Sequence, residues 1–127
     1  VVIAVGGGGV PVIRKDGKVS GTPAVIDKDF GSELLAELLD ADMLVILTAV
    51  DQVAINFNKP DQKGLDKLSV AEAKVYIAEG QFAKGSMLPK VEAAVKFVES
   101  KPGRKSLITS LEKAKEALAG KAGTVLA

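Results

Sequence analysis

Three short apolar runs rich in β-branched residues most constrain the fold of this chain. They are "VVIAV" at residues 1–5, "MLVILT" at 43–48 and "SLITS" at 106–110. A continuous apolar run is typical of a strand buried on both faces of a parallel sheet. Because helical periodicity separates the first two runs, they predict a right-handed parallel crossover. The sequence therefore predicts an α/β domain in which helices cover an open, mostly parallel sheet.

The expected helices are marked by apolar stripes and capping boxes. Ser69 with Glu72 predicts a helix that continues to about Glu79, and Thr109 with Glu112 predicts one that continues to Ala119. A third helix follows Gly85, with a stripe at Met87, Val91, Ala94, Val95 and Val98. A fourth spans residues 29–40, and its apolar face should pack on the sheet through Phe30, Leu34, Leu35, Leu38 and Leu39.

Two further extended segments are expected outside these runs. "PVIRKDGKVSG" at residues 11–21 alternates in character around Asp16-Gly17, which predicts an exposed β-hairpin. "GTVLA" at residues 123–127 predicts a final edge strand.

Composition excludes several classes of chemistry. The chain has 17 basic and 16 acidic residues, so its net charge of +1 predicts no general attraction to nucleic acid or to a membrane surface. It has neither cysteine nor histidine, which removes disulfides, thiolate nucleophiles, imidazole bases and the usual zinc ligands. No apolar run approaches the roughly 20 residues of a membrane span. A cytoplasmic location and no protein-held metal are the expectations.

Two lysines at expected helix starts are the strongest signals of function. Lys28 lies where "AVIDKDFG" passes into a helix, and Lys90 lies in the first turn after "KGSMLP". A cation is disfavoured there by about 0.3–1 kcal/mol, because the helix N-terminus is itself positive. Two such lysines make electrostatic sense if a polyphosphate lies between them. Surface pairing of each lysine with a neighbouring aspartate is the alternative.

The aspartates beside Lys28 allow two interpretations. Aspartate is an ordinary N-cap and first-turn residue, so Asp27 or Asp29 serves the helix alone. A carboxylate there could also hold ammonium groups in position for phosphoryl transfer, a reaction catalysed mainly by positioning and charge stabilisation. That second role is assigned to Asp29.

Two loops after apolar runs are further candidates. Thr48 and Asp51 in "LTAVD" follow a predicted strand, where doubly wound sheets bind nucleotides. The four glycines at residues 6–9 could bring backbone N–H groups to an anion, with at least one glycine at positive φ. A polar turn and a flexible turn are the respective alternatives.

These segments resemble a known family. "GGGGVPVI", "VIDKD", "LTAVD", "FAKGSMLPKVEAA" and "GTVL" occur in this order and at this spacing in the C-terminal half of the carbamate kinases, within the amino acid kinase family. The resemblance covers essentially all 127 residues. It implies an open αβα sandwich, a homodimer, and reversible phosphoryl transfer between ATP, with Mg²⁺, and carbamate to give ADP and carbamoyl phosphate.

The resemblance also implies roles for individual residues. Lys28 and Lys90 would contact the transferring phosphates, and Asp29 would organise the lysines. The backbone of Gly7, Gly8 and Gly9 would face the carbamate. The nucleotide would be bordered by Thr48, Ala49, Asp51, Gly85, Ser86, Met87 and Pro89.

The resemblance places residues 1–127 in the nucleotide-binding C-terminal part of such a kinase, without the N-terminal half. In fermenting bacteria the family makes ATP at the end of arginine breakdown. Two alternatives stay open: another amino acid kinase with a different carboxylate or phosphate acceptor, or a nucleotide-binding fragment without catalysis.

Overall fold

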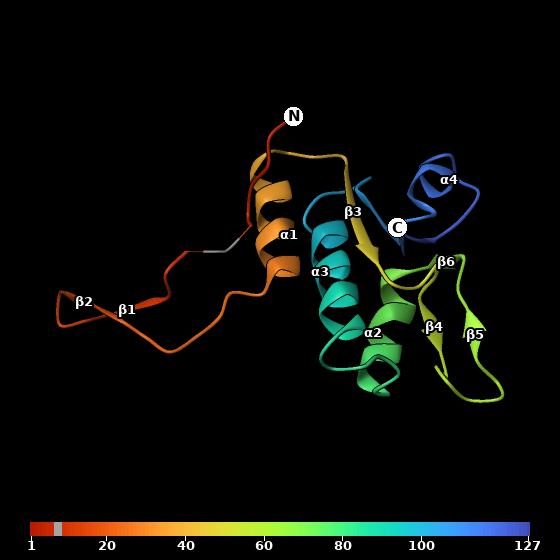
Figure 1. Cartoon of the computed structure of the whole chain (residues 1–127), viewed down its shortest axis with the longest axis horizontal. Coiled ribbons are helices and arrows are strands. Elements are labelled where there is room, and N and C mark those ends of the chain that lie inside the picture. Colours follow the sequence, from red (N-terminus) through yellow and green to blue (C-terminus); the bar gives the residue numbers. More distant parts are fainter. Residues whose placement is uncertain (7–8) are drawn as a thin grey trace.

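The computed structural model describes residues 1–6 and 9–127, and Figure 1 shows their arrangement. Three helices stand in a row beside the sheet, a fourth lies on its other side, and a hairpin extends away from them (Figure 1). The helices are α1 (Lys28–Leu38), α2 (Val70–Ala78), α3 (Met87–Glu99) and α4 (Ala114–Leu118). The strands are β1 (Val12–Lys15), β2 (Lys18–Gly21), β3 (Met43–Thr48), β4 (Ala54–Ile55), β5 (Lys63–Gly64), β6 (Lys67–Leu68), β7 (Lys105–Ser110) and β8 (Thr124–Leu126).

The central sheet has the strand order β3-β7-β8-β6. β3 and β7 run parallel in register from Met43 opposite Lys105 to Thr48 opposite Ser110, and β6 runs parallel to β8. Only the β7–β8 pairing in this sheet is antiparallel. The mainly parallel α/β sheet is confirmed, but residues 124–126 form an interior strand and not the expected edge strand.

The core lies between the sheet and α3. Leu44, Ile46 and Ile108 point from β3 and β7 into one cluster with Val91 and with other residues of α3, chiefly Ala93, Ala94, Val95 and Phe97. Of the predicted stripe of α3, Val91, Ala94 and Val95 are buried as expected, and Met87 and Val98 are partly buried against the same core. Alanines at two adjacent positions let the helix approach the strands closely, as a close-packed interior requires.

The opposite face of the sheet is covered only in part. Leu107 alternates with Ile108 along β7, so it points away from α3, and it is 2% exposed on the side where α4 contacts this strand. Met43, Val45 and Leu47 lie on the same face of β3 and are 36–42% exposed. The N-terminal part of α4 differs from the prediction: Thr109 belongs to β7, and Ser110 Oγ accepts the Lys113 N–H.

The expectation of a strand at residues 1–5 is wrong. These residues form no strand, and the first three are fully exposed. An apolar run becomes a strand only where a partner accepts its backbone hydrogen bonds. Here it passes alongside α1 (Figure 1), where Val5 lies so close that a Cβ on Gly31 would meet it at 2.8 Å. The parallel crossover joins β3 to β7 through α2 and α3 instead.

The predicted apolar face of α1 does not pack on the sheet. Leu34 is 50% exposed and Leu38 75%, whereas Glu33 is fully buried. The helix lies mainly against α3 and makes fewer contacts with β3. The side of α1 that carries Glu33 faces α3 instead, where Lys96, far along the sequence, lies 2.7 Å from its carboxylate and supplies the partner that a buried carboxylate needs.

Local signals for the other elements are confirmed. The hairpin turns at Asp16 and Gly17, whose φ angles of 51° and 76° suit a tight two-residue turn. Ser69 and Glu72 form the predicted reciprocal capping box of α2. Among the described residues, no helix combines the length and apolar character needed to cross a membrane.

Candidate functional site

A cavity of about 450 Å³ lies where α1 and α3 begin. Both lysines singled out from the sequence line it, together with Asp29. Lys28 is exposed, while the side chains of Lys90 and Asp29 are only 20% and 21% exposed. The complete lining is Val25, Ile26, Asp27, Lys28, Asp29, Gly85, Ser86, Pro89 and Lys90.

The start of α1 is fixed by Asp27. Its Oδ1 accepts hydrogen bonds from the backbone N–H groups of Asp29, at 2.8 Å, and Phe30, at 3.4 Å. This is the N-cap role that the sequence left open between the two aspartates. Asp29 is consequently free to use its side chain elsewhere.

Asp29 forms an ion pair with the lysine of the other helix. Its Oδ2 accepts a hydrogen bond from Lys90 Nζ at 2.8 Å, across 61 residues of sequence. No carboxylate pairs with Lys28 among the described residues, so one ammonium is held and the other stays available. Two helix N-termini and an uncompensated cation at one cavity favour an anion.

The N-terminus of α3 has no side-chain cap. Ser86 precedes it with φ −144° and ψ −72°, makes no side-chain capping bond, and is followed by no acidic residue in the first turn. The Ala83 carbonyl accepts the N–H groups of Ser86 and Leu88, which shapes the preceding loop. A helix start without a carboxylate cap is suited to an anionic ligand.

A second cavity, of about 430 Å³, opens at the carboxyl end of β3. This volume is in the range of small-molecule sites. Its position agrees with the rule that open α/β sheets bind ligands beyond the carboxyl ends of their strands. It is lined by Thr48, Ala49, Val50, Gln52, Ala54, Asn56, Phe57, Lys59, Gly80, Gln81, Phe82, Ala83, Ser86 and Met87.

Ser86 lines both cavities, which are therefore neighbours. Of the expected nucleotide residues, Thr48, Ala49 and Met87 line only the second cavity, whereas Gly85 and Pro89 line only the first. Asp51 lines neither of the two, and its backbone carbonyl accepts the Thr109 hydroxyl at 3.3 Å. All of these residues except Asp51 therefore line one or other of two cavities that share Ser86.

Most of the residues that line the second cavity were not identified from the sequence. Asn56, Phe57 and Lys59 come from the segment after β4, and Gln81 from the loop after α2. Gln81 Oε1 accepts the Asn56 N–H at 3.0 Å, which links the two segments. The Asn, Pro and Gly residues of "NFNKPDQKG" are the one signal that could have marked a binding loop.

The glycine prediction remains mostly open. Gly7 and Gly8 lie outside the described residues. Gly6 does not have the left-handed φ that was expected of at least one of the four, and Gly9 lines neither cavity.

The family follows from the sequence itself. Residues 1–110 match the model of the amino acid kinase family, and the chain belongs to that family. It is 61% identical over 126 residues to the carbamate kinase-like protein YqeA of Escherichia coli K12, covering 99% of this chain and 41% of that protein. It is 58% identical to the carbamate kinase of Latilactobacillus sakei, covering 99% of this chain and 40% of the relative.

Comparison with solved structures supports the same family assignment. The carbamate kinase from Giardia lamblia bound to AMP-PNP matches with a TM-score of 0.84 and 45% identity, over 94% of this chain and 37% of that one. The uridylate kinase from Archaeoglobus fulgidus matches with a TM-score of 0.59 and 26% identity, over 78% of this chain and 46% of that one. The chain spans about two fifths of the length of the curated relatives it matches.

Proposed function

We propose that the protein carrying this chain transfers a phosphoryl group reversibly between ATP and carbamate, using carbamoyl phosphate and ADP in the reverse direction. The observation that carries the proposal is the Lys90–Asp29 pair beside Lys28, at two helix N-termini, in a cavity that adjoins a second one through Ser86. The carbamate kinases among the relatives support carbamate as the acceptor.

In this proposal the two cavities divide the nucleotide. The base and ribose occupy the cavity at the end of β3, and the phosphates pass Ser86 toward Lys28 and Lys90. The ammonium groups then lie where charge grows on the transferring phosphoryl group, which is the main catalytic requirement of this reaction. Asp29 keeps Lys90 in one orientation before the substrate arrives, so less ordering is needed during the reaction.

Mg²⁺ is proposed to arrive with the nucleotide. Among the described residues, no cluster of three or more acidic side chains could hold a metal ion, and Asp27 and Asp29 are engaged with the helix start and with Lys90. This donor set fits a Mg²⁺ ion bound chiefly by phosphate oxygens and water. When bound there, the ion neutralises phosphate charge.

Because the relatives are more than twice as long, the activity is proposed for the complete polypeptide. A homodimer, a cytoplasmic location and a place in arginine breakdown are proposed with it. The test is formation of ATP from ADP and carbamoyl phosphate by the complete polypeptide with Mg²⁺. ATP formation is the expected result.

The same assay tests the alternatives. Activity with acetyl phosphate, or ATP consumption with uridylate, in place of the carbamoyl phosphate reaction would indicate another member of the family. Nucleotide binding without turnover of carbamoyl phosphate, acetyl phosphate or uridylate would indicate a nucleotide-binding module. Each of these two outcomes would refute carbamate kinase activity.

A further inference from the structure

α1 and α3 lie side by side (Figure 1). In the ion pairs between them, α1 supplies the acidic residue and α3 the basic one. Asp29 pairs with Lys90 and Glu33 pairs with Lys96, so each acid belongs to α1 and each base to α3. Beyond the ends of the helices, Asp40 pairs with Lys101 and Arg104 in the same order. The helices therefore run in the same direction. Successive ion pairs along their length define the position of one helix relative to the other.

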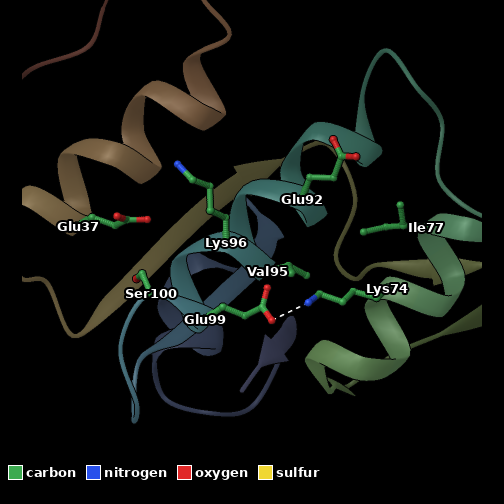
Figure 2. Close-up of a pocket in the computed structure, with 8 residues that line it drawn as sticks. All are labelled: Glu37, Lys74, Ile77, Glu92, Val95, Lys96, Glu99 and Ser100. Atoms are coloured by element: carbon green, nitrogen blue, oxygen red, sulfur yellow. Dashed lines mark hydrogen bonds and ion pairs between the residues drawn. The ribbon is translucent and has the colours of Figure 1, made fainter.

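The Glu33–Lys96 pair is buried at its acidic end only. The Glu33 side chain is fully buried, whereas that of Lys96 is 54% exposed, and Glu33 Oε2 accepts a hydrogen bond from Lys96 Nζ at 2.7 Å. Its Oε1 has no hydrogen-bond partner among the described residues. Figure 2 shows Lys96 extending from α3 toward α1, on the side where the Glu37 side chain lies.

Glu33 is also the only residue of α1 that is fully buried. Leu34 and Leu38 are 50% and 75% exposed, and Phe30 is 36% exposed. Leu35 and Ala36 are only partly buried, and Ala36 packs against the core. These partly buried apolar contacts are non-directional, whereas a charged hydrogen bond is directional, and a buried charged group is best known for specifying register and not for adding stability.

We propose that Glu33 is a positioning residue whose pair with Lys96 holds α1 in the register that places Asp29 against Lys90. Asp29 and Glu33 are four positions apart, about one turn, so a shift of α1 at Glu33 is transmitted to Asp29 almost undiminished. Its kinetic consequence depends on the proposed function, in which a misplacement of about 1 Å can cost on the order of 100-fold in rate.

The test compares variants of the complete polypeptide. Glu33→Met with Lys96→Met removes both charges and keeps similar volumes, so folding is retained even if Lys96→Met alone, which leaves a buried carboxylate unpaired, does not fold. Lys74→Met is the matched control, because Lys74 forms an exposed pair with Glu99 between α2 and α3 and does not involve α1 (Figure 2).

Two quantities are measured for each variant, besides the urea midpoint. One is the ¹⁵Nζ signal of Lys90 in ¹⁵N-lysine-labelled protein, assigned with Lys90→Arg, which reports the Asp29 pair without any catalysis. The other is the split between kcat and KM for ADP phosphorylation. In the double variant we expect a shifted Lys90 signal, a kcat lower by about tenfold or more, and a midpoint equal to or above that of the wild type.

Several results would overturn the inference. A Lys90 signal that is identical in the wild type and the double variant overturns it, whatever the activity. A shift of the Lys90 signal in Lys74→Met equal to that in the double variant also overturns it. An unchanged kcat beside a shifted signal refutes the kinetic part. Wild-type protein without kinase activity, but with the expected Lys90 shift in the double variant, contradicts the proposed function and supports the positioning role.

Discussion

Lys90 and Asp29, whose charged atoms lie 2.8 Å apart, join the first turns of two helices across 61 residues of sequence. Both side chains are about one-fifth exposed, so the pair is screened less than a surface salt bridge. The pair explains why a lysine is tolerated at a helix start, because the neighbouring carboxylate offsets the unfavourable dipole.

Lys90→Ala should affect catalysis much more than folding. We expect kcat for ADP phosphorylation by carbamoyl phosphate to fall by about 100-fold or more, since a fixed donor is removed from a preorganised site. The free energy of unfolding should fall by only about 1–2 kcal/mol for loss of a partly exposed charged hydrogen bond. Lys74→Ala is the control. A near-normal kcat would remove Lys90 from the mechanism, and a protein that unfolds would make its role structural.

Asp27 should stabilise α1 through its capping oxygen. Asp27→Ala is expected to lower the free energy of unfolding by about 1 kcal/mol, because two first-turn N–H groups lose their acceptor. Asp27→Asn keeps an acceptor at the same place and should stay within a few tenths of a kcal/mol of the wild type. Urea midpoints of the three proteins decide the matter, and equal losses in both variants would argue against capping.

Thr124 should stabilise the contact between β8 and the segments next to β4 and β5. Its buried Oγ1 accepts the Val53 N–H at 2.9 Å and donates to the Leu65 carbonyl at 2.5 Å. Thr124→Val preserves shape but leaves a buried N–H and a carbonyl without this partner, so we expect a loss of about 1–3 kcal/mol. Thr124→Ser, which retains the hydroxyl, should lose less in a thermal or urea unfolding series, and the reverse order would contradict the account.

Two carboxylates should respond to pH in opposite directions. Burial, and then the neighbouring Glu37 carboxyl, raise the pKa of Glu33 above its ordinary value of 4.5, despite the opposing effect of Lys96. The stability that Glu33 contributes is thus fully present below that ordinary value and is lost as pH rises through the folded pKa. We expect the stability of Glu33→Gln relative to the wild type to rise as the pH is raised above about 4.

Asp40 supplies the opposite case. Hydrogen bonding and charge from Lys101, followed by the hydrogen bond from Arg104, lower the pKa of its carboxyl below 3.8. Its contribution is present above that value and is lost as pH falls through the folded pKa. Asp40→Asn should therefore become less stable relative to the wild type as pH rises from about 2 to 5. Parallel slopes for the two variants, measured by urea unfolding, would refute these assignments.

Much of the fold could be predicted because its signals are local. The capping box of Ser69 and Glu72, the turn at Asp16 and the strand at 43–48 each depend on neighbouring residues, and each is confirmed. The start of α3 and the shared cavity of Lys28 and Lys90 could be anticipated because helix N-termini are marked in sequence and their electrostatics is general.

The remaining features depend on partners far along the chain. Val2 and Ile3 have the composition of a strand, but pairing requires a neighbour that composition does not reveal. Glu33 reads as a solvent-facing residue until Lys96, 63 positions away, is brought beside it. Gln81 reaches the second cavity only because the loop after α2 meets the segment after β4.

The position of β8 sets an order of assembly. Residues 124–126 lie between β7 and β6, so the strand that connects the two halves of the sheet is the last of the four to leave the ribosome. Until then Leu68 of β6 has no neighbouring strand, and the earlier helices can form only an incomplete core. During synthesis, completion of this sheet must wait for β8, however early its local elements form.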